Sequence, residues 1–477
     1  MNRLQHYIAG RWVPSAVEST PFAVINPATE QQVAEISMGS ATDVDRAVKA
    51  ARAAFPAYAA TSLTERIELL KRLKAIFERR YAEMVTAITT EMGAPHDLSA
   101  SSQAACGPGH IGTTIEAALA LHWEERSGKS ANVVREPVGV CGLITPWNWP
   151  INQVAAKVAP ALAAGCTVIL KPSEQSPLSA QLFAEFIAEA GYPTGVFNMV
   201  HGTGPVVGNA LSVHPDVDMV SFTGSTRAGV SVAKGAADTV KRVSQELGGK
   251  SANIMFADAD LDAAVKRGVL HCFQNSGQSC NAPTRMLVED SVYDRVVAIA
   301  ERIGSGVKVG DPTLPGNQLG PVVSKLQFDK IQKLIAQGIA EGARVVIGGV
   351  GKPAGLEHGY FVKPTIFANV NNQMTIAREE IFGPVLCILR FRTLEEAIAI
   401  ANDTPYGLAA YVQTADQVKA RAVARQLRAG SVYLNGAGQD FETPFGGFKQ
   451  SGNGREWGKH GLTEYLELKA INGFYAA

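Results

Sequence analysis

The feature that most constrains the fold is an alternation of short apolar runs with helical segments, which begins near residue 138. We expect strands at residues 138–145, 167–171, 196–200, 219–223 and 242–246, with helices between them at 153–164, 179–190, 202–211 and 226–237. Five apolar strands joined by helical crossovers predict a parallel sheet of the doubly wound type. Ligands bind such a sheet at the carboxyl ends of its strands, so functional residues are expected there.

The alternation restarts beyond the pair Gly248 and Gly249. Strands are expected at 251–256, 284–288 and 344–347, and helices at 260–273, 292–303 and 328–340. The sequence therefore predicts a second α/β domain, with the two glycines forming the turn between the domains. Upstream we expect a strand at 7–12 and amphipathic helices at 44–55 and 62–93, the second opened by a capping box of Ser62 and Glu65.

Composition excludes several classes of function. The chain has 477 residues, which is long for one domain, and its 44 basic and 44 acidic residues cancel, so a nucleic-acid partner is not expected. Its six cysteines form no CxxC pair, and its nine histidines show no HExxH or HxxxH spacing, so neither a disulfide framework nor a metal site is indicated. No apolar run has the length of a signal peptide or a membrane span, and the cytoplasm is the expected compartment.

Cys280 is the candidate nucleophile. A thiolate is the strongest protein nucleophile near neutral pH, provided that its surroundings lower its pKa or remove its proton. A lone cysteine is more often a small buried apolar side chain, but residues 275–281 (Asn-Ser-Gly-Gln-Ser-Cys-Asn) are small and polar and suit an approached loop better than a core. Glu246 lies upstream at the end of the fifth expected strand, so the carboxylate and the thiol are expected on facing walls of a cleft.

Seven short motifs resemble those of the aldehyde dehydrogenase family, in this order: PWNWP at 146–150, KPSE at 171–174, FTGST at 222–226, ELGGKS at 246–251, GQSC at 277–280, EEIFGP at 379–384 and PFGGFKQSG at 444–452. The resemblance covers nearly the whole chain. It implies a doubly wound, parallel-sheet dinucleotide-binding domain made of residues 1–120 and 138–247, and a second α/β domain at 248–450 that is catalytic.

The resemblance also implies a small bridging β-sheet formed by residues 121–137 and 462–477. In this family such a sheet lies between subunits, so self-association as a dimer or a tetramer is implied. The alternating pattern at 130–137 and 465–470 fits an ordinary edge hairpin equally well.

Two glycine-containing segments are candidates for binding the phosphates of a dinucleotide, and one fits better than the other. Residues 202–208 read GxGxxxG, one residue longer than the usual fingerprint. Residues 224–229 are a better phosphate candidate, because glycine permits close approach, the Ser225 hydroxyl can donate and the following helix N-terminus attracts an anion, although a plain N-cap has the same pattern. The resemblance assigns cofactor binding to Thr145, Trp147, Lys171, Ser173, Glu174, Gly204, Gly208, Phe222, Gly224, Ser225, Thr226, Gly229, Leu247, Glu380 and Phe382.

Within that set, Lys171 and Glu174 match the family's contacts with the adenosine ribose. A carboxylate that accepts from the ribose hydroxyls repels a 2′-phosphate. We therefore expect NAD as the cofactor. NADP is less favoured because of this repulsion, but it stays possible because Lys171 offsets part of it. Glu380 matches the residue that holds the nicotinamide ribose, and Phe382 matches the aromatic side chain beside the nicotinamide, although core packing would explain Phe382 without the match.

The implied reaction is the oxidation of an aldehyde to a carboxylic acid. The Cys280 thiolate would add to the carbonyl carbon and give a thiohemiacetal, while the Asn148 amide and the Cys280 backbone N–H donate to the oxyanion. Hydride loss then leaves a thioester, which is hydrolysed by water activated by Glu246. Burial in a cleft is expected to raise the pKa of Glu246 towards neutrality. Lys157, on the helix after PWNWP, is expected to be solvated or structural.

By resemblance the substrate pocket comprises residues 438–442 together with Trp149, Ser279, Asn281 and Phe445. Its aromatic side chains favour an apolar aliphatic or aryl aldehyde. Asp440 and Glu442 would disfavour an anionic tail if they face the pocket.

Two other interpretations remain open. A cysteine-dependent esterase or hydrolase would use the same thiol with a histidine base, although His271 is expected on the preceding helix and pointing elsewhere. A non-catalytic structural homologue would keep the fold without the chemistry, and the set Asn148, Glu246, Cys280 and Glu380 argues against it.

Overall fold

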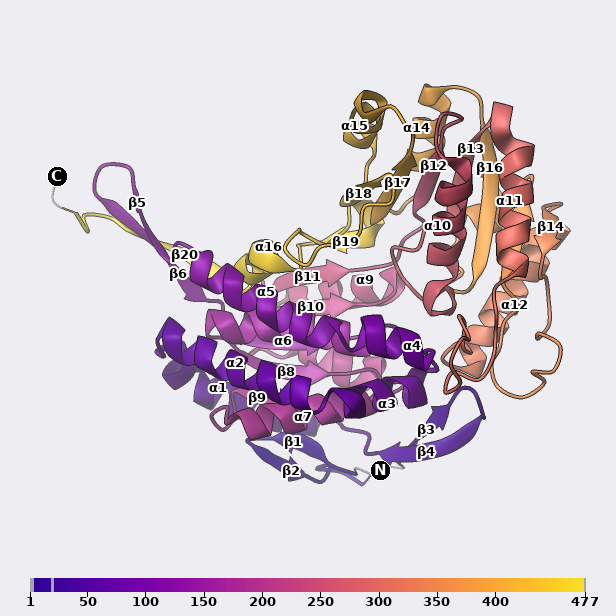
Figure 1. The fold of residues 1–477 in the computed structure, drawn as a ribbon. Helices are drawn as coiled ribbons and strands as arrows, with labels where there is room; N and C mark the ends of the chain where they lie inside the picture. Colours follow the sequence, from indigo (N-terminus) through magenta and orange to yellow (C-terminus); the bar gives the residue numbers. More distant parts are fainter. Residues whose placement is uncertain (1–3, 19–20, 476–477) are drawn as a thin grey trace.

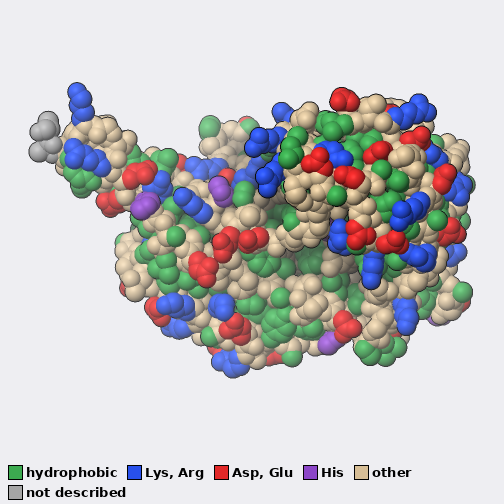
Figure 2. Space-filling view, turned by 45° about the horizontal axis from the view of Figure 1, so that its top comes forward, with side chains coloured by type: hydrophobic (Ala, Val, Ile, Leu, Met, Phe, Trp, Pro, Cys, Tyr) green, Lys and Arg blue, Asp and Glu red, His purple; other side chains and the backbone are tan. Residues whose placement is uncertain are grey.

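The computed structural model describes residues 4–18 and 21–475, so the outermost parts of the predicted ranges 1–120 and 462–477 lie outside it. Two α/β lobes, each built on its own sheet, stand side by side, and a narrow arm projects from the first lobe with the C-terminus at its tip (Figure 1). The surface is hollowed where the two lobes meet (Figure 2). None of the helices within the described residues has the length and apolarity needed to cross a membrane.

The first lobe contains an eight-stranded sheet in the order β19-β11-β10-β7-β8-β9-β1-β2. Its central strands β11, β10, β7, β8 and β9 are parallel, so their carboxyl ends share one edge. The strand bounds are β1 His6–Ile8, β2 Arg11–Val13, β7 Val140–Ile144, β8 Thr167–Lys171, β9 Phe197–Met199, β10 Met219–Thr223, β11 Arg242–Glu246 and β19 Gly452–Asn453.

Helices cover both faces of this sheet, which confirms the doubly wound arrangement. One apolar cluster joins a sheet face to α1 (Ala41–Ala59), α8 (Asn209–Val213) and α9 (Thr226–Ala237). Another joins the opposite face to α2 (Leu63–Arg79), α3 (Tyr81–Met92), α5 (Cys106–Ala120), α6 (Pro150–Ala164) and α7 (Leu178–Ala190). The strands are buried on both sides, which is why they read as continuous apolar runs.

The second lobe contains a seven-stranded sheet in the order β14-β15-β16-β13-β12-β17-β18. Side chains alternate between its faces, so that Leu287 packs towards one helical layer and Met286 towards the other. The strands are β12 Ala252–Met255, β13 Arg285–Glu289, β14 Arg344–Ile347, β15 Thr365–Ala368, β16 Val385–Phe391, β17 Ala409–Gln413 and β18 Ser431–Leu434. The layers are α10 Leu261–Phe273 with α11 Tyr293–Ser305, and α12 Lys325–Ala340 with α13 Thr375–Arg378, α14 Leu394–Asn402 and α15 Gln417–Gln426.

The arm is a separate three-stranded sheet in the order β20-β6-β5, as the resemblance implied. Strand β6 (Ala131–Pro137) pairs antiparallel with both β5 (Glu124–Ser127) and β20 (Leu466–Ile471). Helix α16 (Gly458–Glu464) leads into β20, and a further hairpin is formed by β3 (Phe22–Asn26) and β4 (Gln31–Ile36). Short helical segments occupy α4 (His96–Leu98), Ser99–Gln103, Gly204–Gly208, Gln274–Gly277, Asp290–Val292 and Lys449–Ser451.

Three local predictions were wrong. The single strand expected at 7–12 is a hairpin, because Ala9 and Gly10 both take positive φ and reverse the chain between β1 and β2. The helix expected at 62–93 breaks at Arg80, whose guanidinium lies over the Phe186 ring and bonds Glu185. The helix expected at 202–211 starts later, at Gly204, and runs as a π-helical turn before α8.

Candidate active site

Cys280 lies where two cavities between the lobes meet. One cavity, of about 340 Å³, is lined by aromatic and amide side chains, and the other, of about 210 Å³, is lined by residues from the carboxyl edge of the first sheet. Cys280 lines both. The turn between the lobes passes directly against it, since a Cβ on Gly249 would lie 2.3 Å from the Cys280 carbonyl oxygen. A thiol in this position can therefore react with a molecule in one cavity while another molecule occupies the second.

The loop before the thiol has an unusual backbone. Asn275, Ser276 and Gly277 all have φ between +55° and +73°, a conformation that costs about 1 kcal/mol or more for each residue other than glycine. Only glycine fits at position 277, because a Cβ there would lie 2.0 Å from the Gly383 carbonyl oxygen. The loop is held by buried amides: Gln103 donates to Asn275 Oδ1 at 2.8 Å, and Gln278 Oε1 accepts from the Val323 N–H at 2.9 Å.

Three hydrogen bonds tie the Asn148 loop to the thiol loop. Asn148 Nδ2 donates to the Gln278 carbonyl at 3.0 Å, and the Asn148 carbonyl accepts from Asn275 Nδ2 at 2.8 Å. The Trp149 indole donates to Ser279 Oγ at 2.8 Å. Asn148 is buried, lines the smaller cavity beside Cys280 and keeps one amide proton for a further acceptor. These bonds fix an uncharged donor next to the thiol.

Cys280 is a neutral thiol in this environment. Burial, and then the carboxylates of Glu380 and Glu246, raise the pKa of the Cys280 thiol well above its ordinary value. Glu380 itself is held by the backbone, since its Oε1 accepts from the Gly249 N–H at 2.9 Å. The thiol must therefore lose its proton to a base as it reacts.

Glu246 ends β11 and is buried, with neither carboxyl oxygen hydrogen-bonded within the described residues. Burial, and then the Glu456 carboxylate, raise its pKa well above the ordinary value, in the direction expected from the sequence. Its carboxyl lies against Gly446, whose Cβ would be 2.7 Å from Glu246 Oε1. Glu246 does not itself line either cavity; its neighbours Leu247 and Gly248 form the wall in front of it. No hydrogen bond within the described residues therefore holds this carboxyl in one orientation.

Behind Glu246 lies a buried ion pair between Lys157 and Glu456, two residues 299 positions apart in the chain. Lys157 is fully enclosed and also donates to Ser221 Oγ at 3.0 Å, so it is structural and not solvated. The sequence did not indicate Glu456 as part of the site, because nothing local signals a pairing over that distance.

The smaller cavity gathers eight of the residues singled out from the sequence, and a dinucleotide fits its chemistry. Thr223 Oγ1 lines it, buried and with no partner among the residues described. Ser225 caps α9 by accepting from the Ala228 N–H at 3.3 Å, so the N-cap interpretation is correct and the positive end of α9 faces the cavity as well. The predicted residues that line it are Trp147, Asn148, Gly224, Ser225, Leu247, Cys280, Glu380 and Phe382.

Two lining residues were missed by sequence reasoning. Gln327 and Lys330 lie on α12 of the second lobe; Gln327 donates to the Phe382 carbonyl at 2.8 Å and Lys330 to the Glu380 carbonyl at 2.8 Å. They fix the segment that carries Phe382, whose φ is +59° and whose ring meets Trp147 edge-on at 5.4 Å.

The other predicted cofactor residues do not line this cavity. Lys171, at the end of β8, is buried and donates to Glu174 Oε2 at 3.1 Å, and burial lowers its pKa. Gly204 begins the turn before α8, and a Cβ there would meet nothing within 4 Å. The remaining ones lie near the carboxyl ends of strands of the first sheet, in the turn before α8 or in the first turn of α9: Thr145, Ser173, Gly208, Phe222, Thr226 and Gly229.

The larger cavity contains all four predicted pocket residues: Trp149, Ser279, Asn281 and Phe445. Of the segment 438–442, Gln439 and Phe441 line it, whereas Asp440 and Glu442 do not. Phe445 stacks on Trp457 at 4.4 Å, and Phe441 meets the same indole edge-on at 5.4 Å. Sequence reasoning missed Trp457, and also Asn152 and Gln153 in the first turn of α6.

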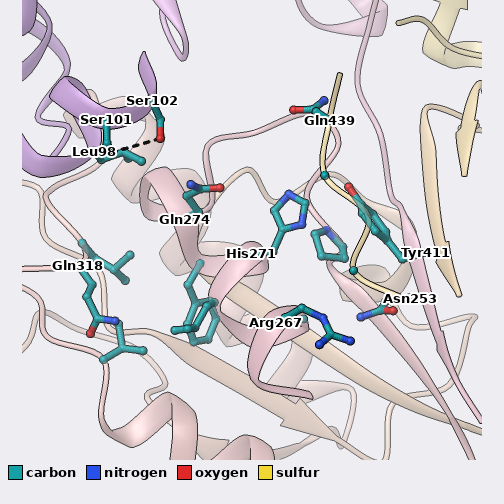
Figure 3. A pocket seen from close by; sticks show the side chains of 18 of the residues that line it. Leu98, Ser101, Ser102, Asn253, Arg267, His271, Gln274, Gln318, Tyr411 and Gln439 are labelled. Atoms are coloured by element: carbon teal, nitrogen blue, oxygen red, sulfur yellow. Dashed lines mark hydrogen bonds between the residues drawn. The ribbon is translucent and has the colours of Figure 1, made fainter. Parts of the chain in front are cut away.

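His271 was expected to point elsewhere, but it lines this cavity together with Cys280. Its ring meets Tyr411 edge-on at 5.3 Å, and burial lowers its pKa to about 4, so it is neutral. A third cavity, of about 740 Å³, adjoins the 340 Å³ cavity, which is the larger of the two that Cys280 lines. The two share Ser101, Ser102, His271, Gln274 and Gln439. His271 at the end of α10 and Gln274 just after it project into the space between Ser101–Ser102 and Gln439 (Figure 3).

Comparison with known proteins agrees with this arrangement. The sequence model of the aldehyde dehydrogenase family matches residues 12–471. A 3-succinoylsemialdehyde-pyridine dehydrogenase from Pseudomonas is 56% identical over 472 residues, which cover 98% of each chain. The structure of aldehyde dehydrogenase C from Pseudomonas syringae, in complex with NAD+ and octanal, shares 50% identity at a TM-score of 0.98, covering 100% of this chain and 98% of that one. A Mycobacterium tuberculosis aldehyde dehydrogenase complexed with NAD+ shares 41% identity at a TM-score of 0.96, covering 99% and 98%.

Proposed function

Because this chain belongs to the aldehyde dehydrogenase family and is an NAD-dependent oxidoreductase, we propose that it oxidises aldehydes through a covalent intermediate on Cys280. The observation that carries the proposal is the position of Cys280 at the junction of two cavities. The aromatic cavity holds the aldehyde, and the other holds the nicotinamide end of the cofactor. When bound, NAD supplies the acceptor for the hydride that the substrate carbon loses.

Cys280 attacks first. Its sulfur forms a bond to the aldehyde carbon, and the carbonyl oxygen takes up the negative charge. The free Nδ2 proton of Asn148 and the Cys280 backbone N–H donate to that oxygen. Because burial raises the pKa of the Cys280 thiol, its proton must leave to water from the solvent before or during attack.

Hydrolysis follows. Once the substrate carbon has lost its hydride, the acyl group is bound to the Cys280 sulfur as a thioester. Glu246 takes a proton from a water molecule, the hydroxide adds to the thioester, and the C–S bond breaks to release the carboxylic acid and regenerate the sulfur. A raised pKa suits this role, since a carboxyl that titrates closer to neutrality is a stronger base.

Medium-chain aliphatic or aryl aldehydes are the proposed substrates. The stacked rings of Phe445 and Trp457, with Phe441 at their edge, offer flat apolar surface. Within the part of the chain that the structure describes, no lysine, arginine, aspartate or glutamate lines the cavity. The relatives support the same range, because one is complexed with octanal and another is named for a pyridine semialdehyde. Rates of NADH formation at 340 nm across a panel of aldehydes test the proposal. The substrate proposal is refuted if an aldehyde with a carboxylate tail has the highest kcat/KM in the panel.

A thiol hydrolase is the second candidate, because His271 lines the same cavity as Cys280. An esterase would cleave an activated ester at the same rate with and without NAD, and Cys280→Ala would abolish that cleavage. The dehydrogenase proposal requires NADH formation from an aldehyde that also disappears in Cys280→Ala.

Self-association as a dimer or a tetramer is proposed for the arm formed by β5, β6 and β20. Leu468, Ile471 and Phe474 expose large apolar side chains there, which a second copy of the chain would cover. Light scattering coupled to size exclusion gives the mass. A monomer at micromolar concentration would refute the assignment. The predicted domain limits and the cytoplasmic compartment stand as proposals alongside it.

A further inference from the structure

The larger cavity is neutral throughout. Among the described residues no lysine, arginine, aspartate or glutamate lines it, and the His271 ring in its wall is neutral because burial lowers its pKa to about 4. Two carboxyl groups, Glu246 and Glu380, lie close enough to the thiol to raise its pKa. An anionic substrate tail would find no cation to replace its lost hydration and would be repelled near the thiol.

Neutral does not mean apolar, however. Asn152 and Gln153, in the first turn of α6, bring two side-chain amides to the wall of the cavity that also contains Cys280. Both side chains are more than nine-tenths buried. A buried amide that lacks partners costs about 1–3 kcal/mol, so such groups are normally satisfied by the protein or by a ligand.

The polar groups around the cavity differ in how they are satisfied. Ser279 Oγ accepts from the Trp149 indole at 2.8 Å, and Asn152 Oδ1 is bonded to His110 Nε2 at 2.7 Å. Gln153 makes no side-chain hydrogen bond to any residue that the structure describes, and its Oε1 is fully enclosed. The end of this amide that reaches the cavity is therefore Nε2, a donor. Trp457 Nε1 is a second buried donor in the lining without a partner among the described residues.

From these groups we infer that the cavity selects aldehydes that carry a neutral hydrogen-bond acceptor, such as a ketone oxygen or a ring nitrogen, on an aryl or alkyl body, and that Gln153 recognises this acceptor. The inference rests on the proposed aldehyde oxidation and narrows its substrate class. The stacked rings of Phe445 and Trp457 bind the body, while the unpartnered amide of Gln153 donates to the acceptor. A purely apolar aldehyde would bind the rings and leave the amide unsatisfied.

The test compares 4-oxo-4-phenylbutanal with 4-phenylbutanal, two aldehydes whose difference is the ketone oxygen. The wild-type protein is expected to prefer the ketone by roughly tenfold in kcat/KM, the effect of one hydrogen bond between neutral groups. Gln153→Met, which keeps the length of the side chain and removes its amide, is expected to abolish the preference by raising KM for the ketone alone. Gln426→Met, on the exposed surface of α15, is the matched control and keeps the preference.

Several outcomes overturn the inference. Equal kcat/KM values for the two aldehydes in the wild type, or an undiminished preference in Gln153→Met, show that the amide does not recognise the ketone. Gln153→Asn, which withdraws the amide by one methylene, gives a second reading if the methionine variant does not fold, and it must lower the preference. If neither aldehyde reduces NAD with the wild type, the proposed function itself fails, which is a different result from oxidation without preference.

Discussion

Substitution of Asn275 separates two effects on the stability of the thiol loop: the hydrogen bonds of the Asn275 amide and the strain of its positive φ. Its φ is +55°, its side chain is 1% exposed, and its amide both donates to the Asn148 carbonyl and accepts from Gln103, each at 2.8 Å. Asn275→Gly removes the amide and adopts this φ freely, whereas Asn275→Ala removes the amide and keeps a Cβ that is strained at this φ. Loss of the two buried hydrogen bonds costs about 2–4 kcal/mol. At this φ the Cβ of the alanine variant costs about 1 kcal/mol more than the glycine variant.

Chemical denaturation followed by tryptophan fluorescence measures both costs. We expect midpoints in the order wild type, Asn275→Gly, Asn275→Ala. We also expect kcat to fall in both variants while KM for NAD changes less, because the Asn148 loop loses its donor and the cofactor edge of the sheet is untouched. Equal midpoints for the two variants would show that the left-handed backbone stores no strain here. A glycine variant as stable and as active as the wild type would refute the argument that the amide holds the loop.

Three further predictions follow from the site and its surroundings. Asn148→Ala removes an oxyanion donor and should lower kcat by about 100-fold in steady-state assays, with KM for NAD little changed; an unchanged kcat contradicts the role. His6 and His110 are buried and neutral, and burial lowers the pKa of each to about 4 against 6.5 when exposed. The free energy of unfolding therefore decreases as the pH falls from 6.5 towards 4, by about 1.4 kcal/mol per pH unit for each histidine. His110→Asn should make the pH dependence of the denaturation midpoint less steep. An equally steep dependence would show that His110 is not responsible. Glu174→Gln should lower KM for NADP more than KM for NAD, because it removes the charge that repels a 2′-phosphate; equal changes would show that Glu174 does not select the cofactor.

The first sheet was predictable because both of its faces are covered. Strands buried on both sides read as short apolar runs, and the predicted bounds of β8, β10 and β11 agree with the structure residue for residue. The second sheet was predicted less completely. Its strands β15, β16, β17 and β18 were not assigned from the sequence, although α14 and α15 lie between the last three of them.

Local irregularities escaped prediction for a different reason. The reversal at Ala9–Gly10 and the helix break at Arg80 carry no proline or Asn-Gly signal, and one partner of Arg80, Glu185, is more than 100 residues away. The same holds in the site. Motifs located Cys280, Glu246 and Asn148, whereas the amide network behind the thiol and the Lys157–Glu456 pair exist only through long-range packing.

The aromatic cavity beside Cys280 shows most clearly what cannot be predicted from the sequence. A glutamine in an apolar helix, such as Gln153, has no sequence pattern that tells whether its amide is satisfied. Only the positions of its neighbours reveal that it faces the cavity without a partner.

The central claim is that the Cys280 thiol and the Glu246 carboxyl act in sequence on one substrate carbon, and the Glu246→Gln variant tests it most directly in a stopped-flow measurement at 340 nm. With saturating aldehyde and NAD, the account predicts a burst of one NADH per active site followed by almost no turnover, because the thioester forms and is not hydrolysed. Steady NADH production at the wild-type rate, or the absence of any burst, would contradict it.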